Sequence, residues 1–147
     1  MTPEEMKQRT KKFALRVIGL VDALPKDHAA NVIGRQLLRA GTSVGSNYLA
    51  ACRARSQAEF IAKLGIVEEE ADESIYWMEL LTEGGLMQRK RLSPLMKEAG
   101  ELLAIVVSSI NTARGDSRGA GGRESAIRNP QSAMGPPQAS GMARNHG

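Results

Sequence analysis

The sequence predicts an all-α protein, an antiparallel up-down-up-down four-helix bundle with a disordered C-terminal tail. Between residues 60 and 81, apolar and small residues recur at alternating steps of four and three, which places them on one stripe of a helix. The segment 33–51 keeps the same alternation, so two helices of matching period can face each other across a short connection. Aromatic residues make up only 3% of the chain and long β-branched alternations do not occur, which favours helices over strands.

The first helix is expected to begin after Thr2. The Thr2 hydroxyl can cap the helix, Pro3 suits the first helical position, and Glu5 can complete a capping box. Pro25 should end this helix, because proline cannot donate the backbone hydrogen bond that would continue it.

The second helix is expected to begin after Asp27, which can cap it, and to run to about Arg53. It contains several small residues, among them Gly34, Gly41 and Gly45. A glycine inside a helix costs roughly 0.5–1 kcal/mol relative to alanine, so several of them require a compensating close approach of another backbone. Tight packing within one chain and packing between subunits both fit this pattern.

The third helix is expected to begin after Ser56. The Ser56 hydroxyl can accept from a first-turn amide, while the Glu59 carboxylate can accept from the N–H of the cap residue itself. The helix should run to about Glu83, where Gly84 and Gly85 provide a C-terminal stop.

The fourth helix is expected to open at Ser93 and Pro94, after a short basic loop at 88–92, and to end near residue 114. Beyond that point the sequence loses all periodicity and is rich in Gly, Ser, Pro and Arg, so it cannot bury enough apolar surface to offset its own ordering. The expected domains are therefore a four-helix bundle at 1–114 and a disordered tail at 115–147.

Composition excludes several classes of protein. Cys52 is the only cysteine, and the two histidines, His28 and His146, have no carboxylate or thiol neighbours at ligand spacing, so we expect no metal site and no cofactor. No apolar run approaches 18 residues and no signal peptide is recognisable, so we expect a cytoplasmic protein without membrane contact. The balance of 20 basic and 16 acidic residues permits nucleic-acid binding without indicating it.

The centre of the third helix carries an acidic run, Glu68–Glu73. Because no histidine, nucleophile or phosphate-binding loop accompanies it, we expect no enzymatic activity and assign the run to ion pairs. If the second and third helices are antiparallel about residues 54 and 55, Arg39 lies near the level of Ala71. We therefore predict a partly buried ion pair of Arg39 with Glu68 or Asp72.

Basic residues gather in three places, whose plainest interpretation is a solvated surface. Two of these places, the start of the first helix and the second connection, share one end of an up-down-up-down bundle, whereas residues 89–91 lie at the other end. The candidate nucleic-acid contacts are those of the shared end: Lys7, Lys11, Lys12, Arg53 and Arg55.

The sequence from about residue 5 to 113 resembles the bacterial four-helix-bundle proteins encoded in intervening sequences of 23S ribosomal RNA genes. The likeness is carried by a small-residue helix containing an Asn, by a Ser-x-x-Glu-Phe helix start and by a Glu-rich third helix. These features correspond to Ser43, Asn47, Ser56, Glu59, Phe60 and the run Glu68–Glu73.

This resemblance implies a ring-like homopentamer. It also implies similarity to the accessory subunits of diversity-generating retroelements, which bind reverse transcriptase and nucleic acid. The chain departs from the family pattern in its tail and at 51–55, where Ala-Cys-Arg-Ala-Arg replaces the Glu-Gly turn of many relatives. Our leading hypothesis is a non-enzymatic oligomeric scaffold that associates with RNA or a ribonucleoprotein. The alternative is a protein-protein adaptor that binds no nucleic acid.

Overall fold

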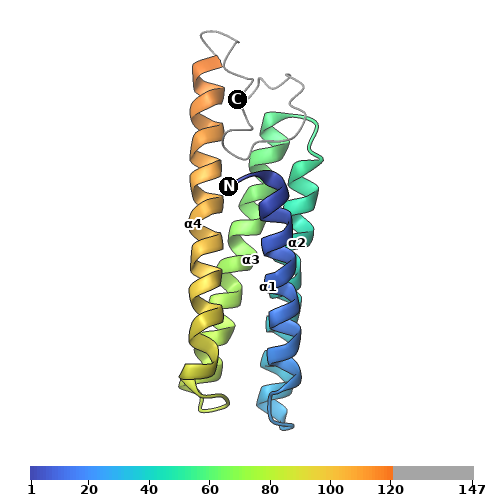
Figure 1. The fold of residues 1–147 in the computed structure, drawn as a ribbon, viewed down its shortest axis with the longest axis vertical. Helices are drawn as coiled ribbons and strands as arrows, with labels where there is room; N and C mark the ends of the chain where they lie inside the picture. The colour runs from blue at the N-terminus through green and yellow to red at the C-terminus, as the bar shows by residue number, and fades with distance from the viewer. Residues whose placement is uncertain (121–147) are drawn as a thin grey trace.

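The computed structural model describes residues 1–120 and consists of four helices, so the predicted fold class is confirmed. The expected tail beyond residue 120 lies outside the described residues. The helices are α1 (Pro3–Asp22), α2 (His28–Cys52), α3 (Gln57–Glu83) and α4 (Arg89–Ala120). They run alternately up and down, with the start of α1 and the α2–α3 connection at one end and the other two connections at the opposite end (Figure 1).

The predicted caps of α1, α2 and α3 are present. Thr2 and Glu5 form a reciprocal capping box, with the Glu5 N–H donating to Thr2 Oγ1 at 3.1 Å and the Thr2 N–H donating to Glu5 Oε1 at 2.8 Å. Asp27 accepts from the Ala30 N–H at 2.9 Å. Each interaction satisfies a backbone N–H that has no partner inside its helix.

The start of α3 differs from a reciprocal capping box in one bond. Ser56 Oγ accepts from the Glu59 N–H at 3.0 Å, as predicted. The Glu59 carboxylate, however, accepts from the Arg55 N–H at 3.1 Å rather than from the N–H of Ser56. The side chain therefore ties down the residue before the cap and fixes the backbone of the α2–α3 connection. At the other end of α3, Gly85 has a positive φ of 73°, in agreement with the predicted stop.

The start of α4 was predicted wrongly. The helix begins at Arg89 instead of Ser93, so the basic segment 89–92 forms its first turn, and Pro94 lies inside the helix. Ser93 Oγ donates to the Arg89 carbonyl at 3.0 Å and is not a cap. Pro94 cannot donate to the carbonyl four residues earlier, but the extra turn places Leu92 in the core with no exposed surface, which offsets that loss.

The end of α4 also differs from expectation, because the helix continues to Ala120 and the predicted boundary at residue 114 falls inside it. The predicted hydrophobic periodicity stops at Ala113, the last buried residue of α4 among those up to residue 116. Periodicity reports burial and not helicity, and no proline interrupts residues 114–120. The helix therefore extends beyond the point at which the hydrophobic periodicity of the sequence ends.

The core lies along the bundle axis and follows the predicted stripe closely in α3. All seven buried residues of α3 were predicted from the 4-3 alternation: Phe60, Leu64, Val67, Ala71, Ser74, Met78 and Leu81. In α2 the agreement is partial, because Ile33 and Asn47 are only half-buried while Gly34, Gly41 and Tyr48 are buried.

The glycines of α2 serve packing within one chain, which decides between the two interpretations of their pattern. A Cβ added at Gly41 would lie 2.8 Å from Val17 Cγ2, and one at Gly34 would lie 3.0 Å from Leu24 Cδ1. A Cβ at Gly45 would lie 3.2 Å from Thr10 Oγ1. Since all three neighbours belong to α1 or directly follow it, the glycines allow α1 to approach α2 closely.

Candidate nucleic-acid interface

Arg39 of α2 forms an ion pair with the acidic run of α3, but its partners are not the predicted ones. Its Nη1 lies 3.2 Å from Glu70 Oε1 and its Nη2 lies 2.8 Å from Glu73 Oε2. The hydrogen bond to Glu73 is the main reason why the pKa of Arg39 is raised. The prediction of Glu68 or Asp72 is therefore wrong, although the predicted level along α3 is right.

The prediction was wrong about which side of α3 faces Arg39, and right about the level of Arg39 along α3. At 100° per residue, Glu70 and Glu73 lie on one flank of the buried stripe, whereas Glu68 and Asp72 lie on the other. The first flank faces α2. The pair is also less buried than expected, because 48% of the Arg39 side chain is exposed, although only 17% of Glu70 is. Glu73 additionally accepts from Trp77 Nε1 at 3.3 Å, so one carboxylate orients both side chains.

A second ion pair, which the sequence did not predict, joins α1 to α4. Arg9 Nε donates to Glu98 Oε2 at 2.7 Å and Arg9 Nη2 donates to Glu98 Oε1 at 2.9 Å, a two-point contact that matches the planar guanidinium. Nη2 also donates to Glu101 at 2.6 Å, and Glu101 is paired with Lys97 at 3.1 Å. Hydrogen bonding to Glu98 is the main cause that raises the pKa of Arg9. The residues are 89 and 92 positions apart, and no local motif marks such a contact.

The predicted nucleic-acid residues lie at one end of the bundle, as expected. Burial, the largest effect, raises the pKa of the Cys52 thiol, and the charges of Lys7 and Arg53, which both lie near this thiol, partly oppose the rise. Arg53 caps α2, Arg55 precedes the cap of α3, and both side chains are exposed. The start of α1 and the α2–α3 connection, which carry these residues, lie at the same end of the bundle (Figure 1).

The five residues do not all share one face. Lys7 and Lys11 are four residues apart and occupy the side of α1 nearer α2, whereas Lys12 and Arg16 occupy the side that faces α4. Lys7 is half-buried and lies 3.9 Å from Glu4, so part of its charge is compensated. Lys11 and Lys12 are exposed, and the structure gives neither an ion pair among the described residues.

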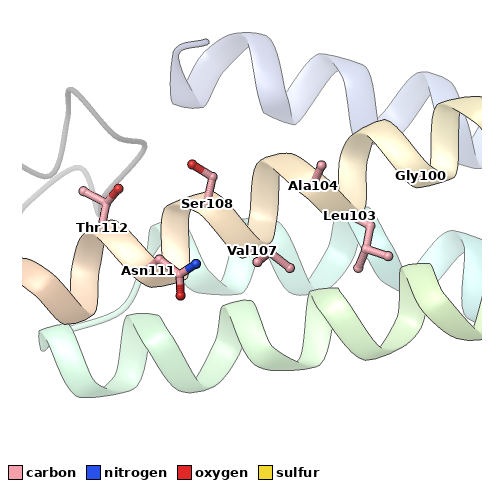
Figure 2. Close-up of a pocket in the computed structure, with 7 residues that line it drawn as sticks. All are labelled: Gly100, Leu103, Ala104, Val107, Ser108, Asn111 and Thr112. Carbon is pink, nitrogen blue, oxygen red and sulfur yellow. The ribbon is translucent and has the colours of Figure 1, made fainter.

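The outer face of α4 is free of charge over several turns. A shallow groove runs along it, and its side chains point outward or toward α3 (Figure 2). We call this surface the α4 groove; its lining residues are Gly100, Leu103, Ala104, Val107, Ser108, Asn111 and Thr112. Small neutral side chains at helical spacing can accept a close neighbour without desolvating any charge.

Within residues 1–120, no group of three or more His, Cys, Asp or Glu side chains is placed to hold a metal ion. No helix in this part of the chain is long and apolar enough to cross a membrane. The fold therefore defines an all-α four-helix-bundle protein.

Comparison with known proteins identifies the family. The model of the family described as 23S rRNA-intervening sequence protein matches residues 4–108, and the chain belongs to this family. A similar solved structure is that of a protein of unknown function from the S23 ribosomal protein family of Bacteroides thetaiotaomicron VPI-5482. It is 34% identical, the alignment covers 71% of this chain and 97% of that chain, and the TM-score is 0.68. No curated protein matches the chain.

Proposed function

We propose that this protein is a non-enzymatic, oligomeric helical scaffold that associates in the cytoplasm with RNA or a ribonucleoprotein, such as a complex containing a reverse transcriptase. The observation that supports RNA binding is the basic end of the bundle, where Arg53 and Arg55 are exposed in the α2–α3 connection and Lys7 of α1, like Arg53, lies near Cys52. Arg53 and Arg55 have no ion pair among the described residues, and such unpaired cations can replace the counterions of a phosphate backbone.

Self-association is supported by surfaces that a solitary bundle leaves exposed. The α4 groove is uncharged, and on α1 the side chains of Leu15 and Ile18 are exposed, with residue exposures of 61% and 41%. On α3, Tyr76 is 50% exposed and stacks edge-on against Trp77 at a centroid distance of 5.1 Å. Covering such surfaces in a symmetric assembly would remove them from water. The family resemblance implies five subunits.

A ring would strengthen a weak basic surface. Because the same end of every subunit repeats around the ring axis, the few charges of one chain become an array that can bind one long polyanion at several points. The basic end and the α4 groove thus have separate roles. The basic end binds RNA, and the α4 groove joins the subunits so that the basic end is repeated around the ring.

The RNA part is tested by charge reversal of Lys11, Lys12 and Arg55 to glutamate. Retention of a labelled RNA is measured at low salt and across a salt series, together with helicity and mass by light scattering. We expect the triple variant to lose RNA retention while helicity and mass stay unchanged, and the wild type to lose affinity steeply as salt rises.

A matched control reverses three exposed basic residues toward the opposite end, Lys26, Arg35 and Lys90. This control changes net charge by the same amount and should retain RNA. Equal loss in both variants would show that binding follows net charge alone and would contradict the assignment to the basic end. Absence of RNA retention by the wild type at low salt would favour the protein-protein adaptor.

A further inference from the structure

The α1–α4 contact contains a second charged level, two helical turns away from the Arg9–Glu98 pair. Moving seven residues along α1 from Arg9 leads to Arg16, and moving seven residues back along the antiparallel α4 from Glu98 leads to Arg91. Seven residues restore nearly the same side of a helix, so Arg16 and Arg91 occupy the positions that the ion pair occupies two turns away. At this level Arg91 occupies the position on α4 that corresponds to the carboxylate of Glu98.

The two arginines line one cavity. Its volume is about 260 Å³, and it is bounded by Arg16, Gly19 and Leu20 of α1 and by Arg91 and Leu95 of α4. A Cβ built at Gly19 would meet nothing within 4 Å, so the absence of a side chain there leaves the cavity open. This volume is below the roughly 300–1,000 Å³ typical of sites for drug-sized ligands, and it suits a small polyatomic ion with some water.

The charge around this cavity is uncompensated. No carboxylate lines it, and neither arginine has an ion pair or side-chain hydrogen bond within the described part of the chain. Arg91 also belongs to the first turn of α4, which contains Arg89 and Lys90 and no acidic residue. Cations at a helix N-terminus are repelled by the positive end of the helix dipole, which instead attracts anions.

We propose that Arg16 and Arg91 bind a phosphate group between α1 and α4. An oxyanion in the cavity supplies the negative charge that Glu98 supplies to Arg9, and two guanidinium groups can each offer it paired N–H donors. This site goes beyond the proposed function, since it lies at the end of the bundle opposite to Arg53 and Arg55 and does not depend on RNA being bound there.

The test measures the thermal stability of the full chain in inorganic phosphate, against chloride at matched ionic strength and fixed protein concentration. We expect a saturable rise in Tm of about 5 °C at ten times the Kd, from the linkage of ligand binding to folding. The rise should disappear in Arg16→Gln and in Arg91→Gln. It should persist in Arg35→Gln, an exposed arginine on α2 outside the cavity.

A further variant, Arg91→Glu, rebuilds at this level the arrangement of Arg9 with Glu98. It should raise Tm in chloride and remove the response to phosphate. The proposal is overturned if phosphate does not raise the Tm of the wild type, or if the rise is the same in Arg16→Gln and Arg91→Gln.

The source of the phosphate is distinguished with a short oligoribonucleotide that has no terminal phosphate. Weaker binding of this probe to Arg16→Gln and Arg91→Gln, alongside the lost phosphate response, assigns the site to the RNA backbone. Unchanged binding of the probe assigns it to free phosphate or a phosphorylated small molecule. Charge reversal at the basic end should leave the Tm response to inorganic phosphate intact. Loss of RNA retention and loss of the phosphate response can therefore be told apart.

Discussion

The close approach of α1 to α2 at Gly41 makes a quantitative prediction. Replacing Gly41 by alanine would place the new Cβ 2.8 Å from Val17 Cγ2 and 2.9 Å from Val17 Cγ1. Such distances require something to move. Val17 is completely buried and, being β-branched, has one strongly preferred rotamer in a helix, so its side chain cannot turn away at low cost.

Two opposing effects decide the sign of the change in stability. Alanine gains roughly 0.5–1 kcal/mol over glycine inside a helix. Forcing an extra methyl group into a packed core costs about 1–3 kcal/mol. We therefore expect Gly41→Ala to lower the free energy of unfolding by about 1–2 kcal/mol, with the cost of overpacking exceeding the gain in helix propensity.

The measurement is equilibrium unfolding in urea followed by circular dichroism at fixed protein concentration. The midpoint should fall while the m-value stays constant. Gly65→Ala on α3 is the matched control, because nothing lies within 4 Å of a Cβ at that position, and it should gain roughly 0.5–1 kcal/mol. If Gly41→Ala were as stable as Gly65→Ala, the close contact with Val17 would not limit packing, and the reasoning would be refuted.

The remaining predictions concern surface charges and the proposed subunit contact. Arg39→Ala should cost only about 0.5–1 kcal/mol because this arginine is half-exposed, and Glu68→Gln should be nearly neutral in the same urea titration; a larger effect of Glu68→Gln would contradict the observed pairing. Hydrogen bonding lowers the pKa values of Glu5 and Glu101 below their ordinary value of 4.5, so the unfolded state binds more protons than the folded state as the pH falls. The stability that these two carboxylates contribute should therefore be present above about pH 4.5 and be lost as the pH falls below it. Replacing both by glutamine should flatten this acid limb in unfolding measured from pH 6 to pH 3, and an unchanged limb would argue against these hydrogen bonds. In the proposed oligomer, Val107→Glu, in the middle of the α4 groove, should reduce the mass measured by light scattering to that of one chain; an unchanged mass of several chains would place the proposed subunit contact elsewhere.

Sequence patterns predicted the parts of the fold that depend on local chemistry and period. The caps at Thr2, Asp27 and Ser56 follow from side chains that can accept from nearby backbone N–H groups. The buried stripe of α3 follows from its 4-3 alternation. The start of α4 was not predicted, because Ser93 followed by Pro94 has the sequence of a helix cap. The burial of Leu92 in the core instead favours a helix that begins at Arg89.

Contacts between helices were predicted less well because they depend on rotation as well as on level. The level of Arg39 on α3 was correct, but which flank of α3 faces α2 is set by how all four helices pack, and this placed Glu70 and Glu73 beside it. The Arg9–Glu98 pair joins the two ends of the folded chain, so no local spacing indicates it. The cavity between Arg16 and Arg91 escaped prediction for the same reason.

The limited contact between α1 and α4 has a consequence for how the bundle forms and opens. The extensive helix contacts all join helices that are neighbours in sequence, and only the smaller α1–α4 contact joins the ends of the folded chain. A topology dominated by local contacts folds rapidly, and closing the longest loop should come last. The α1–α4 contact is thus the natural place for the bundle to part first, and amide hydrogens on the α4-facing side of α1 should exchange earlier than those of α3.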